Sequence, residues 1–226
     1  MRFVLVRHAQ SHNNRLWAET GSVAARVPDP ELTALGRRQA DAVATAARRW
    51  DWRPTQVYAS LMVRALQTAV PLGETLDLPV RAHPELYEVG GPFVESDGVR
   101  TPWPGSPRSV LQRLGGRIEL PQEASEAGWY AGPYEAEADA AERAARVVAG
   151  LRAAHAPDDV VVLVTHGWFT QHLLRTLLGG TGIPTWFTVN NAAVSLVAEV
   201  DPRLPCPVEV RRLNDVGHLG PGEVTE

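Results

Sequence analysis

Two short continuous apolar runs stand out along the chain, at residues 3–6 (FVLV) and 160–164 (VVVLV). Both are rich in β-branched residues, and such runs are typical of strands buried on both faces of a parallel sheet. We therefore predict that they are central strands of one sheet. Further strands are predicted at residues 56–59, 80–82, 193–200 and 208–213.

Alanine-rich segments of helical character alternate with these strands. Thr33 and Ser60 are the expected N-caps of the first two helices, because a hydroxyl can accept a hydrogen bond from a free amide of the first turn. Since strands and helices alternate, we predict an α/β fold with a largely parallel sheet and helices on both faces. The predicted helices span residues 33–49, 61–76 with a break near Pro71, 137–155 and 168–178.

A chain of 226 residues is long enough for one large domain, which we place at residues 1–226. Glycine and proline interrupt the alternation between about residues 90 and 132. We interpret that stretch as an insertion that caps one end of the sheet and the active site there. Trp103, Trp129 and Tyr130 lie in or beside it, and they either line a pocket or anchor the loop by packing.

The composition excludes several classes of function. All 22 basic residues are arginine, so the chain lacks the lysine that P-loop proteins, Schiff-base enzymes and protein kinases require. A single cysteine, Cys206, excludes an intramolecular disulfide and a cysteine-rich zinc module. The net charge of −4 argues against nucleic-acid binding. With no apolar run of signal-peptide or membrane-span length, we expect a cytoplasmic protein without membrane contact.

One local echo links the two predicted central strands. Residues 4–9 read VLVRHA and residues 162–167 read VLVTHG, so each strand is followed at once by a histidine, His8 or His166. Open α/β sheets bind ligands in the crevice beyond the carboxyl ends of their strands. We therefore expect the two histidines to converge.

The first candidate cluster follows residue 6 and contains a cation, imidazoles and amides: Arg7, His8, His12 and Asn14. Arginine presents a planar fork of donors that suits phosphate or carboxylate, and a neutral imidazole is a competent nucleophile. A polar loop with one satisfied histidine is the alternative. The spacing of His8 and His12 suits a metal only on a helix, whereas this segment leaves a strand, so no metal site is predicted and His12 is placed at the pocket rim.

The second candidate cluster centres on Arg64, in the first turn of a predicted helix. A cation is disfavoured beside the positive end of a helix. Its position therefore calls for a compensating anion, which a bound phosphate would supply. An exposed arginine with a small electrostatic penalty is the alternative.

Five segments in chain order form a set of motifs. They match Arg7, His8, Ala9 and Asn14 to R-H-G-x-[ST]-x-x-N; Leu32, Thr33, Gly36, Gln39 and Ala40 to L-T-x-x-G-x-x-Q-A; Ser60, Arg64, Ala65, Gln67, Thr68 and Ala69 to S-x-x-x-R-A-x-Q-T-A; Leu86 and Glu88 to L-x-E; and His166 with Gly167 to a second histidine segment. Together they resemble the histidine phosphatase superfamily, over residues 3 to about 195. The resemblance implies the phosphoglycerate-mutase-like fold, a three-layer sandwich.

Two departures from the family pattern are visible. Ala9 stands where the family has glycine, and Val-Gly-Gly-Pro follows Glu88 where the family often has an aromatic residue and glycine. Glu85 and Glu95 therefore compete with Glu88 for the role of the acid. The motif of the secreted phosphatase branch is absent.

The resemblance implies a phosphomonoester hydrolase that acts on a small phosphorylated metabolite through a phosphohistidine at His8. Arg7, Arg64 and His166 would clamp the phosphoryl group, with a hydrogen bond from Asn14. Glu88 would serve as general acid and base, and no metal or cofactor is implied.

Two rival functions remain open: a phosphoglycerate mutase, whose basic substrate loop is not apparent at residues 90–132, and a non-catalytic phospholigand-binding module. A homodimer is possible through pairing of a sheet edge at residues 194–200 or 208–210.

Overall fold

The computed structural model describes residues 1–23, 25–96, 98–180 and 184–226. A central sheet with the strand order β6-β3-β2-β7-β1-β8-β9 occupies the middle layer. The first five strands in this order are mutually parallel. Strand β8 pairs antiparallel with β1, and β9 pairs antiparallel with β8. The strands of the sheet are β1 (Arg2–Arg7), β2 (Gln56–Ser60), β3 (Val80–His83), β6 (Ile118–Glu119), β7 (Val160–Thr165), β8 (Val194–Glu199) and β9 (Val208–Asp215).

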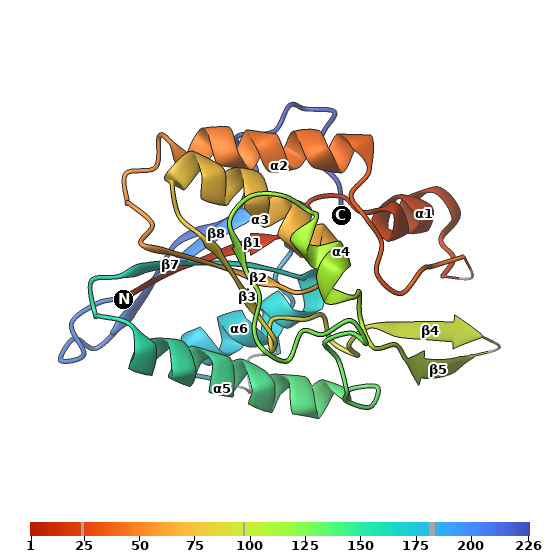
Figure 1. Ribbon diagram of the computed structural model, residues 1–226. Coiled ribbons are helices and arrows are strands. Elements are labelled where there is room, and N and C mark those ends of the chain that lie inside the picture. The colour runs from red at the N-terminus through yellow and green to blue at the C-terminus, as the bar shows by residue number, and fades with distance from the viewer. Residues whose placement is uncertain (24, 97, 181–183) are drawn as a thin grey trace.

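Helices cover both faces of this sheet, as the sequence predicts (Figure 1). Alternate residues of β1 face opposite layers: Val4 and Val6 pack in the cluster with α2 and α3, while Phe3 and Leu5 pack in the cluster with α5 and α6. A strand buried on both faces explains the uninterrupted apolar run. The helices are α1 (His12–Thr20), α2 (Ala34–Ala47), α3 (Val63–Leu76), α4 (Arg108–Gln112), α5 (Glu137–Ala154) and α6 (Gly167–Leu177).

Helix α3 differs from its prediction at both its start and its middle. It continues through Pro71 without a break, because burial of the flanking Val70 and Leu72 stabilises the helix against the amide bond that proline removes. Ser60 is not its N-cap. It ends β2, and the helix begins after Met62, which makes no side-chain cap bond.

Helix α1 was not predicted, because its segment reads as a polar loop. Ser11 and Asn14 form a capping box there: each side chain accepts a hydrogen bond from the other residue's backbone amide. This reciprocal pair satisfies two amides that the helix start leaves free. The chain therefore turns from strand to helix within five residues of His8.

The stretch from residue 90 to 132 contains a two-stranded hairpin, β4 (Phe93–Ser96) with β5 (Val99–Pro102), then α4 and the edge strand β6. The hairpin projects from the sheet on the same side of the molecule as α1 (Figure 1). Trp129 is buried and packs against Tyr87 and Tyr130. Gly105 makes room for it, since a Cβ there would lie 2.3 Å from the indole nitrogen.

The sheet order corrects one of the two edges proposed for a homodimer. Residues 194–199 form β8, which lies between β1 and β9 and has no free edge. Strand β9 forms that edge instead. Among the described residues, no helix has the length and hydropathy that crossing a bilayer requires.

Helix α2 begins in direct contact with the loop that follows β1. Thr33 caps it as predicted, its hydroxyl accepting from the Gly36 amide at 3.0 Å. A Cβ at Gly36 would lie 2.0 Å from the carbonyl oxygen of Gln10. Only glycine permits this approach of the helix to the loop between His8 and Ser11.

We predict that Gly36→Ala destabilises the protein by about 1–3 kcal/mol, the usual cost of overpacking, and lowers its activity by displacing the loop beside His8. Chemical unfolding gives the free energy. Gly150→Ala is the matched control: Gly150 lies within α5 and a Cβ there meets nothing within 4 Å, so stability should rise by up to about 1 kcal/mol. An unchanged free energy for Gly36→Ala would contradict the packing argument.

Candidate active site

The two predicted histidines converge at the carboxyl edge of the sheet. Strands β1 and β7 pair in parallel up to Arg7 with Thr165, and the His8 amide donates to the Thr165 carbonyl at 2.8 Å. The rings of His8 and His166 lie 5.1 Å apart between centroids at 62°. The convergence expected from the repeated strand ends is confirmed.

His8 is held as a neutral imidazole with a defined tautomer. Its Nδ1 lies 2.8 Å from the Ala9 carbonyl oxygen; because a carbonyl only accepts, Nδ1 carries the proton and Nε2 the lone pair. Arg64 Nε donates to that Nε2 at 3.1 Å. Burial, and then the charges of Arg64 and Arg7, lower the pKa of His8 well below its usual range.

The anion that Arg64 requires is supplied by the protein itself. Asp29, only 2% exposed in its side chain, lies 3.9 Å from the Arg64 guanidinium. The same carboxylate accepts from the Val63 amide at 2.9 Å and from the Ser106 hydroxyl at 2.8 Å. It therefore caps α3 from a distant loop and pairs with Arg64. The sequence predicts a bound phosphate in this role and gives no sign of Asp29.

Burial dominates the electrostatics of this pair. It raises the pKa of Asp29 to about 6, although Arg64 opposes the shift. It also lowers the pKa of Arg64 to about 10. Both groups are charged at neutral pH and fixed in place.

Arg7 and His166 present polar atoms that lack partners among the described residues: Arg7 Nε and both ring nitrogens of His166. His166 is the N-cap of α6, and the next residue, Gly167, leaves the room that Arg7 fills, since a Cβ there would lie 3.3 Å from Arg7 Nε. Buried unpaired polar atoms call for a ligand. Donors gathered at a helix N-terminus suit an anion such as phosphate.

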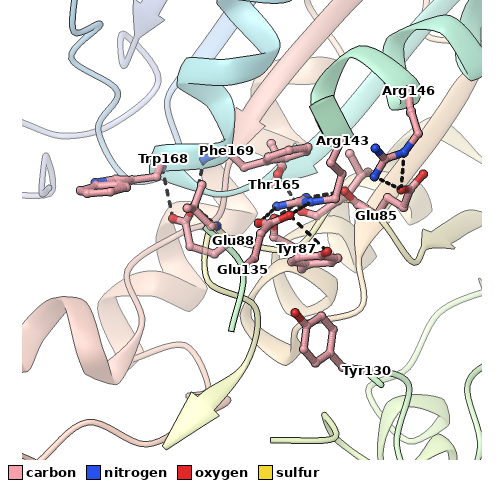
Figure 2. A network of polar contacts seen from close by, with 12 residues as sticks. Glu85, Tyr87, Glu88, Tyr130, Glu135, Arg143, Arg146, Thr165, Trp168 and Phe169 are labelled. Atoms are coloured by element: carbon pink, nitrogen blue, oxygen red, sulfur yellow. Dashed lines mark hydrogen bonds and ion pairs between the residues drawn. The ribbon is translucent and has the colours of Figure 1, made fainter. Parts of the chain in front are cut away.

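Of the three candidate carboxylates, Glu88 lies nearest to this helix start. It accepts from the amides of Trp168 at 3.2 Å and Phe169 at 2.9 Å, and both contacts are drawn in Figure 2. Glu85 instead pairs with Arg146 at 3.0 Å, and both side chains are partly exposed. Glu95 pairs with Arg100 on the hairpin at 2.9 Å. The geometry favours Glu88 over its two competitors.

A pocket of about 250 Å³ is lined by Arg64 and Glu88, whereas Arg7, His8 and His166 are not among its lining residues. Asn13 lines it, whereas Asn14, the motif residue, is not in the lining and its side-chain oxygen is engaged in the capping box. His12 is exposed and contacts Arg15. Trp103, Trp129 and Tyr130 do not line this pocket. The lining side chains with chemistry are Asn13, Arg26, Arg64, Glu88, Glu95, Arg100, Tyr134 and Trp168.

Comparison with known proteins decides the family. The model of the histidine phosphatase superfamily (branch 1) matches residues 3–205. The chain belongs to this family. A curated relative, the glucosyl-3-phosphoglycerate phosphatase of Mycobacterium tuberculosis, is 31% identical over 204 residues, which cover 82% of this chain and 83% of the relative.

Solved structures agree with the fold of this histidine phosphatase. A mycobacterial glucosyl-3-phosphoglycerate phosphatase in complex with inorganic phosphate superposes with a TM-score of 0.62 at 25% identity, covering 97% of this chain and 99% of that one. A phosphoserine phosphatase mutant from Entamoeba histolytica has a TM-score of 0.61 at 20% identity, covering 96% and 98%.

Several residues of the family motifs in this histidine phosphatase hold the backbone around the site by hydrogen bonds and have no role in the proposed chemistry. Gln39 accepts from the Gln10 amide at 2.8 Å and donates to the Glu223 carbonyl, so it ties the loop after β1 to the C-terminal tail. Gln67 accepts from the Leu32 amide at 2.8 Å. Thr68 accepts from the Ala9 amide at 3.0 Å. The bonds to the Ala9 and Gln10 amides fix the backbone that follows His8.

A buried arginine that sequence reasoning missed holds the Glu88 segment. Arg143 of α5 pairs with both oxygens of Glu135 and lies between the rings of Tyr87 and Phe169, 3.6 and 3.8 Å from their centroids. It also donates to the carbonyls of Glu85 and Tyr87 (Figure 2). In the sequence, Arg143 is one position of a predicted helix, and that position gives no sign of these distant partners.

We predict that Asp29 controls the acid side of the activity profile. As the pH falls through about 6, Asp29 takes up a proton and Arg64 loses its counter-charge, so kcat/KM should fall. Asp29→Asn keeps an acceptor for Val63 but no charge. At pH 8 it should lose about 10–100-fold, the value of a charged hydrogen bond, and the ratio of wild type to variant should approach one below pH 6.

The contribution of Asp29 to the stability of the fold depends on pH in the opposite direction to its contribution to activity. The native carboxyl binds its proton more tightly than an unfolded aspartate of pKa 3.8, so Asp29 stabilises the fold below pH 4 and loses that contribution as the pH rises through about 6.

In the activity test, titration of the substrate phosphate is common to the wild type and Asp29→Asn, so it cancels in the ratio of their kcat/KM values. A ratio that does not change with pH would refute the role of Asp29.

Proposed function

We propose that this histidine phosphatase hydrolyses phosphomonoesters of small metabolites through a phosphohistidine at His8. The observation that carries the proposal is the buried, neutral His8, whose Nε2 lone pair faces Arg64 and whose ring lies 5.1 Å from that of His166. Arg7 Nε and both ring nitrogens of His166 have no partner among the described residues. Relatives named as phosphatases of glucosyl-3-phosphoglycerate and phosphoserine support a small substrate.

In the first displacement, the lone pair of His8 Nε2 attacks phosphorus and the bond from phosphorus to the ester oxygen breaks. In the free site, Arg64 Nε donates a hydrogen bond to His8 Nε2. When phosphate binds, Arg64 donates to a phosphate oxygen instead, and the Nε2 lone pair becomes free to attack. The departing alkoxide takes a proton from Glu88, which its backbone bonds place at the start of α6. A nitrogen–phosphorus bond on His8 and a free alcohol result.

In the second displacement, water attacks the phosphohistidine and Glu88 accepts its proton. The nitrogen–phosphorus bond breaks, inorganic phosphate leaves and His8 regains its lone pair. One carboxyl therefore serves as acid and then as base.

Charge stabilisation in this scheme comes from the two buried arginines and the start of α6. The family resemblance implies that His166 is a third member of the cationic clamp. Burial lowers the pKa of His166 well below its usual range, with further lowering by Arg64, so it contributes a neutral N–H donor. Among the described residues, no group of His, Cys, Asp and Glu side chains has the arrangement of a metal site. We propose a mechanism that needs no metal.

A mutase would return the phosphoryl group to a sugar acid instead of water. The 90–132 stretch brings one arginine into the pocket, Arg100, and it is paired with Glu95. That pairing favours hydrolysis. A binding module without catalysis would have no use for a neutral imidazole nucleophile beside an acid.

We predict that His8→Ala lowers kcat by at least about 10³-fold, as expected for loss of a nucleophile, and leaves the fold intact. The wild type, quenched during turnover of a ³²P-labelled ester, should carry an acid-labile and base-stable phosphoryl group that the variant lacks. Circular dichroism and unfolding check the fold. Full activity of the variant would overturn the assignment.

Glu88→Gln separates the proposed acid role from a structural one. The variant should slow phosphoenzyme formation from alkyl phosphates by about 10²–10⁴-fold, typical of general acid catalysis, and much less from aryl phosphates, whose leaving group needs little protonation. Single-turnover rates are required, because the same carboxyl also acts in the second step.

Glu85→Gln and Glu95→Gln are the matched controls for this test. Neither should show any dependence on the leaving group. An equal loss on both ester types for Glu88→Gln, or the leaving-group dependence in a control, would assign the acid elsewhere.

A further inference from the structure

A single hydroxyl outside the pocket joins two buried amide side chains. Thr225 lies on the C-terminal segment, whereas Gln39 lies on α2 and Asn191 lies just before β8. The Thr225 hydroxyl accepts from Gln39 Nε2 at 3.0 Å and donates to Asn191 Oδ1 at 3.0 Å. Gln39 and Asn191 are both 0% exposed. The proposed chemistry uses none of these three side chains.

This hydroxyl determines which way each amide faces. A hydroxyl has one proton, and because Thr225 gives it to the Asn191 oxygen, it can only accept from Gln39. The Gln39 nitrogen therefore faces Thr225, and its oxygen faces the Gln10 amide, from which it accepts at 2.8 Å. The Asn191 oxygen faces Thr225 in the same way, and its nitrogen donates to the His8 carbonyl at 3.2 Å.

The two amides hold the two peptide units on either side of Ala9. The unit between His8 and Ala9 has its carbonyl bound by Asn191. The unit between Ala9 and Gln10 has its N–H bound by Gln39, and its carbonyl accepts from His8 Nδ1 at 2.8 Å. One end of that second unit is therefore held by Gln39 while the other end holds the imidazole proton.

The Ala9 carbonyl matters most once a substrate is bound. In the free site, Arg64 also favours an unprotonated Nε2, because it donates its own proton there. In the proposed mechanism Arg64 turns to the phosphate, and a proton on Nε2 would then bond to a phosphate oxygen and block the attack. The peptide unit between Ala9 and Gln10 must stay in place to keep the proton on Nδ1.

Resting on the proposed function, we propose that Thr225 is a positioning residue for His8. Through Gln39 and Asn191 it holds the peptide units around Ala9, and it thereby keeps the ring proton on Nδ1. Thr225 itself touches neither the substrate nor the reacting atoms. Its loss should therefore lower the rate of phosphoryl transfer and leave substrate binding nearly unchanged.

The kinetic test compares Thr225→Val, which removes the hydroxyl at almost the same volume, with Thr225→Ser, which keeps it. Thr225→Val should slow single-turnover phosphoenzyme formation at saturating ester by about 10–100-fold, the cost of a small misplacement of a reacting group. The half-saturating ester concentration should stay nearly the same. Alkyl and aryl phosphates should lose equal factors, because the nucleophile is affected and not the leaving group. Thr225→Ser should regain most of the rate.

A second readout reports on His8 without turnover. In ¹⁵N-labelled protein, the Nδ1 proton of His8 should give a ring N–H signal that exchanges slowly with solvent and is absent from His8→Ala. Thr225→Val should speed this exchange by roughly tenfold or more, since exchange follows local opening and the loss of a buried hydrogen bond favours opening by about that factor. Thr225→Ser should restore slow exchange.

Thr55→Val is the matched control. The Thr55 hydroxyl also joins two groups, donating to Asp159 at 2.8 Å and accepting from the Val160 amide at 3.2 Å, but it lies where β7 begins, at the opposite edge of the sheet from His8. This variant should keep the wild-type rate and the slow ring exchange. If it slows the reaction as much as Thr225→Val does, the effect is general destabilisation and the inference is overturned.

The two readouts keep the inference apart from the proposed function. If the wild type forms no phosphoenzyme, the proposed function fails, and the exchange of the His8 ring proton still decides whether Thr225 holds the imidazole. If the wild type forms the phosphoenzyme and Thr225→Val keeps either the wild-type rate or the wild-type exchange, the positioning role of Thr225 is overturned and the proposed function stands.

Discussion

The in-register parallel pairing of β1 with β7 is the constraint on which the site depends. Each strand ends at the same level of the sheet, Arg7 opposite Thr165, so the residue after each strand, His8 or His166, enters the same crevice. Parallel strands bury both faces, and the helices that cover them begin at this edge. The start of α6 therefore lies beside both histidines, and its amides are available to hold Glu88. A one-residue slip of either strand would turn one histidine to the opposite face of the sheet.

Buried ion pairs fix the groups that the sheet cannot place. Asp29 with Arg64 and Glu135 with Arg143 are both withdrawn from solvent. Desolvation offsets much of the attraction in such pairs, so they are weak contributors to net stability, whereas the loss of one partner is costly. The main effect of these two ion pairs is to hold Arg64 and the segment before Glu88 in fixed positions. Arg64 is directed at His8 by a carboxylate that also caps α3, and Arg143 binds the carbonyls of Glu85 and Tyr87, just before Glu88. Each pair joins segments far apart in the chain: Asp29 contacts Ser106 of the 90–132 stretch, and Arg143 of α5 contacts the loop after β3.

The sequence predicted whatever is encoded locally. Apolar runs marked the central strands and thus the convergence of His8 with His166, and the Thr33 hydroxyl marked the start of α2. The errors arose where a distant residue replaces a local signal. Ser60 looked like a cap because it is the hydroxyl residue just before the predicted helix. The true acceptor at the start of α3 is Asp29, more than thirty positions earlier in another loop, and nothing local in the sequence indicates it. Helix α1 was missed because its stretch is polar and lacks an apolar stripe. Pro71 suggested a break that packing on both sides overrides. The neutral state of His166 depends on burial and on neighbouring arginines, which no spacing reveals.

Neutral histidines and buried arginines together determine what the site can bind. Burial lowers the pKa of both imidazoles and also disfavours the charge on Arg7 and Arg64. Arg64 is paired with Asp29, whereas Arg7 forms no ion pair with the described residues. A neutral ligand would satisfy the free donors but would not compensate the buried charge of Arg7 in a medium of low polarity. A tetrahedral dianion supplies both several acceptor oxygens and the compensating charge. Its binding therefore stabilises the charged arginines. His8 keeps its lone pair at the same time, because the Ala9 carbonyl holds the ring proton on Nδ1 and leaves Nε2 unprotonated. Anion recognition and nucleophilicity are thus provided by different atoms, and the site needs both at the same pH.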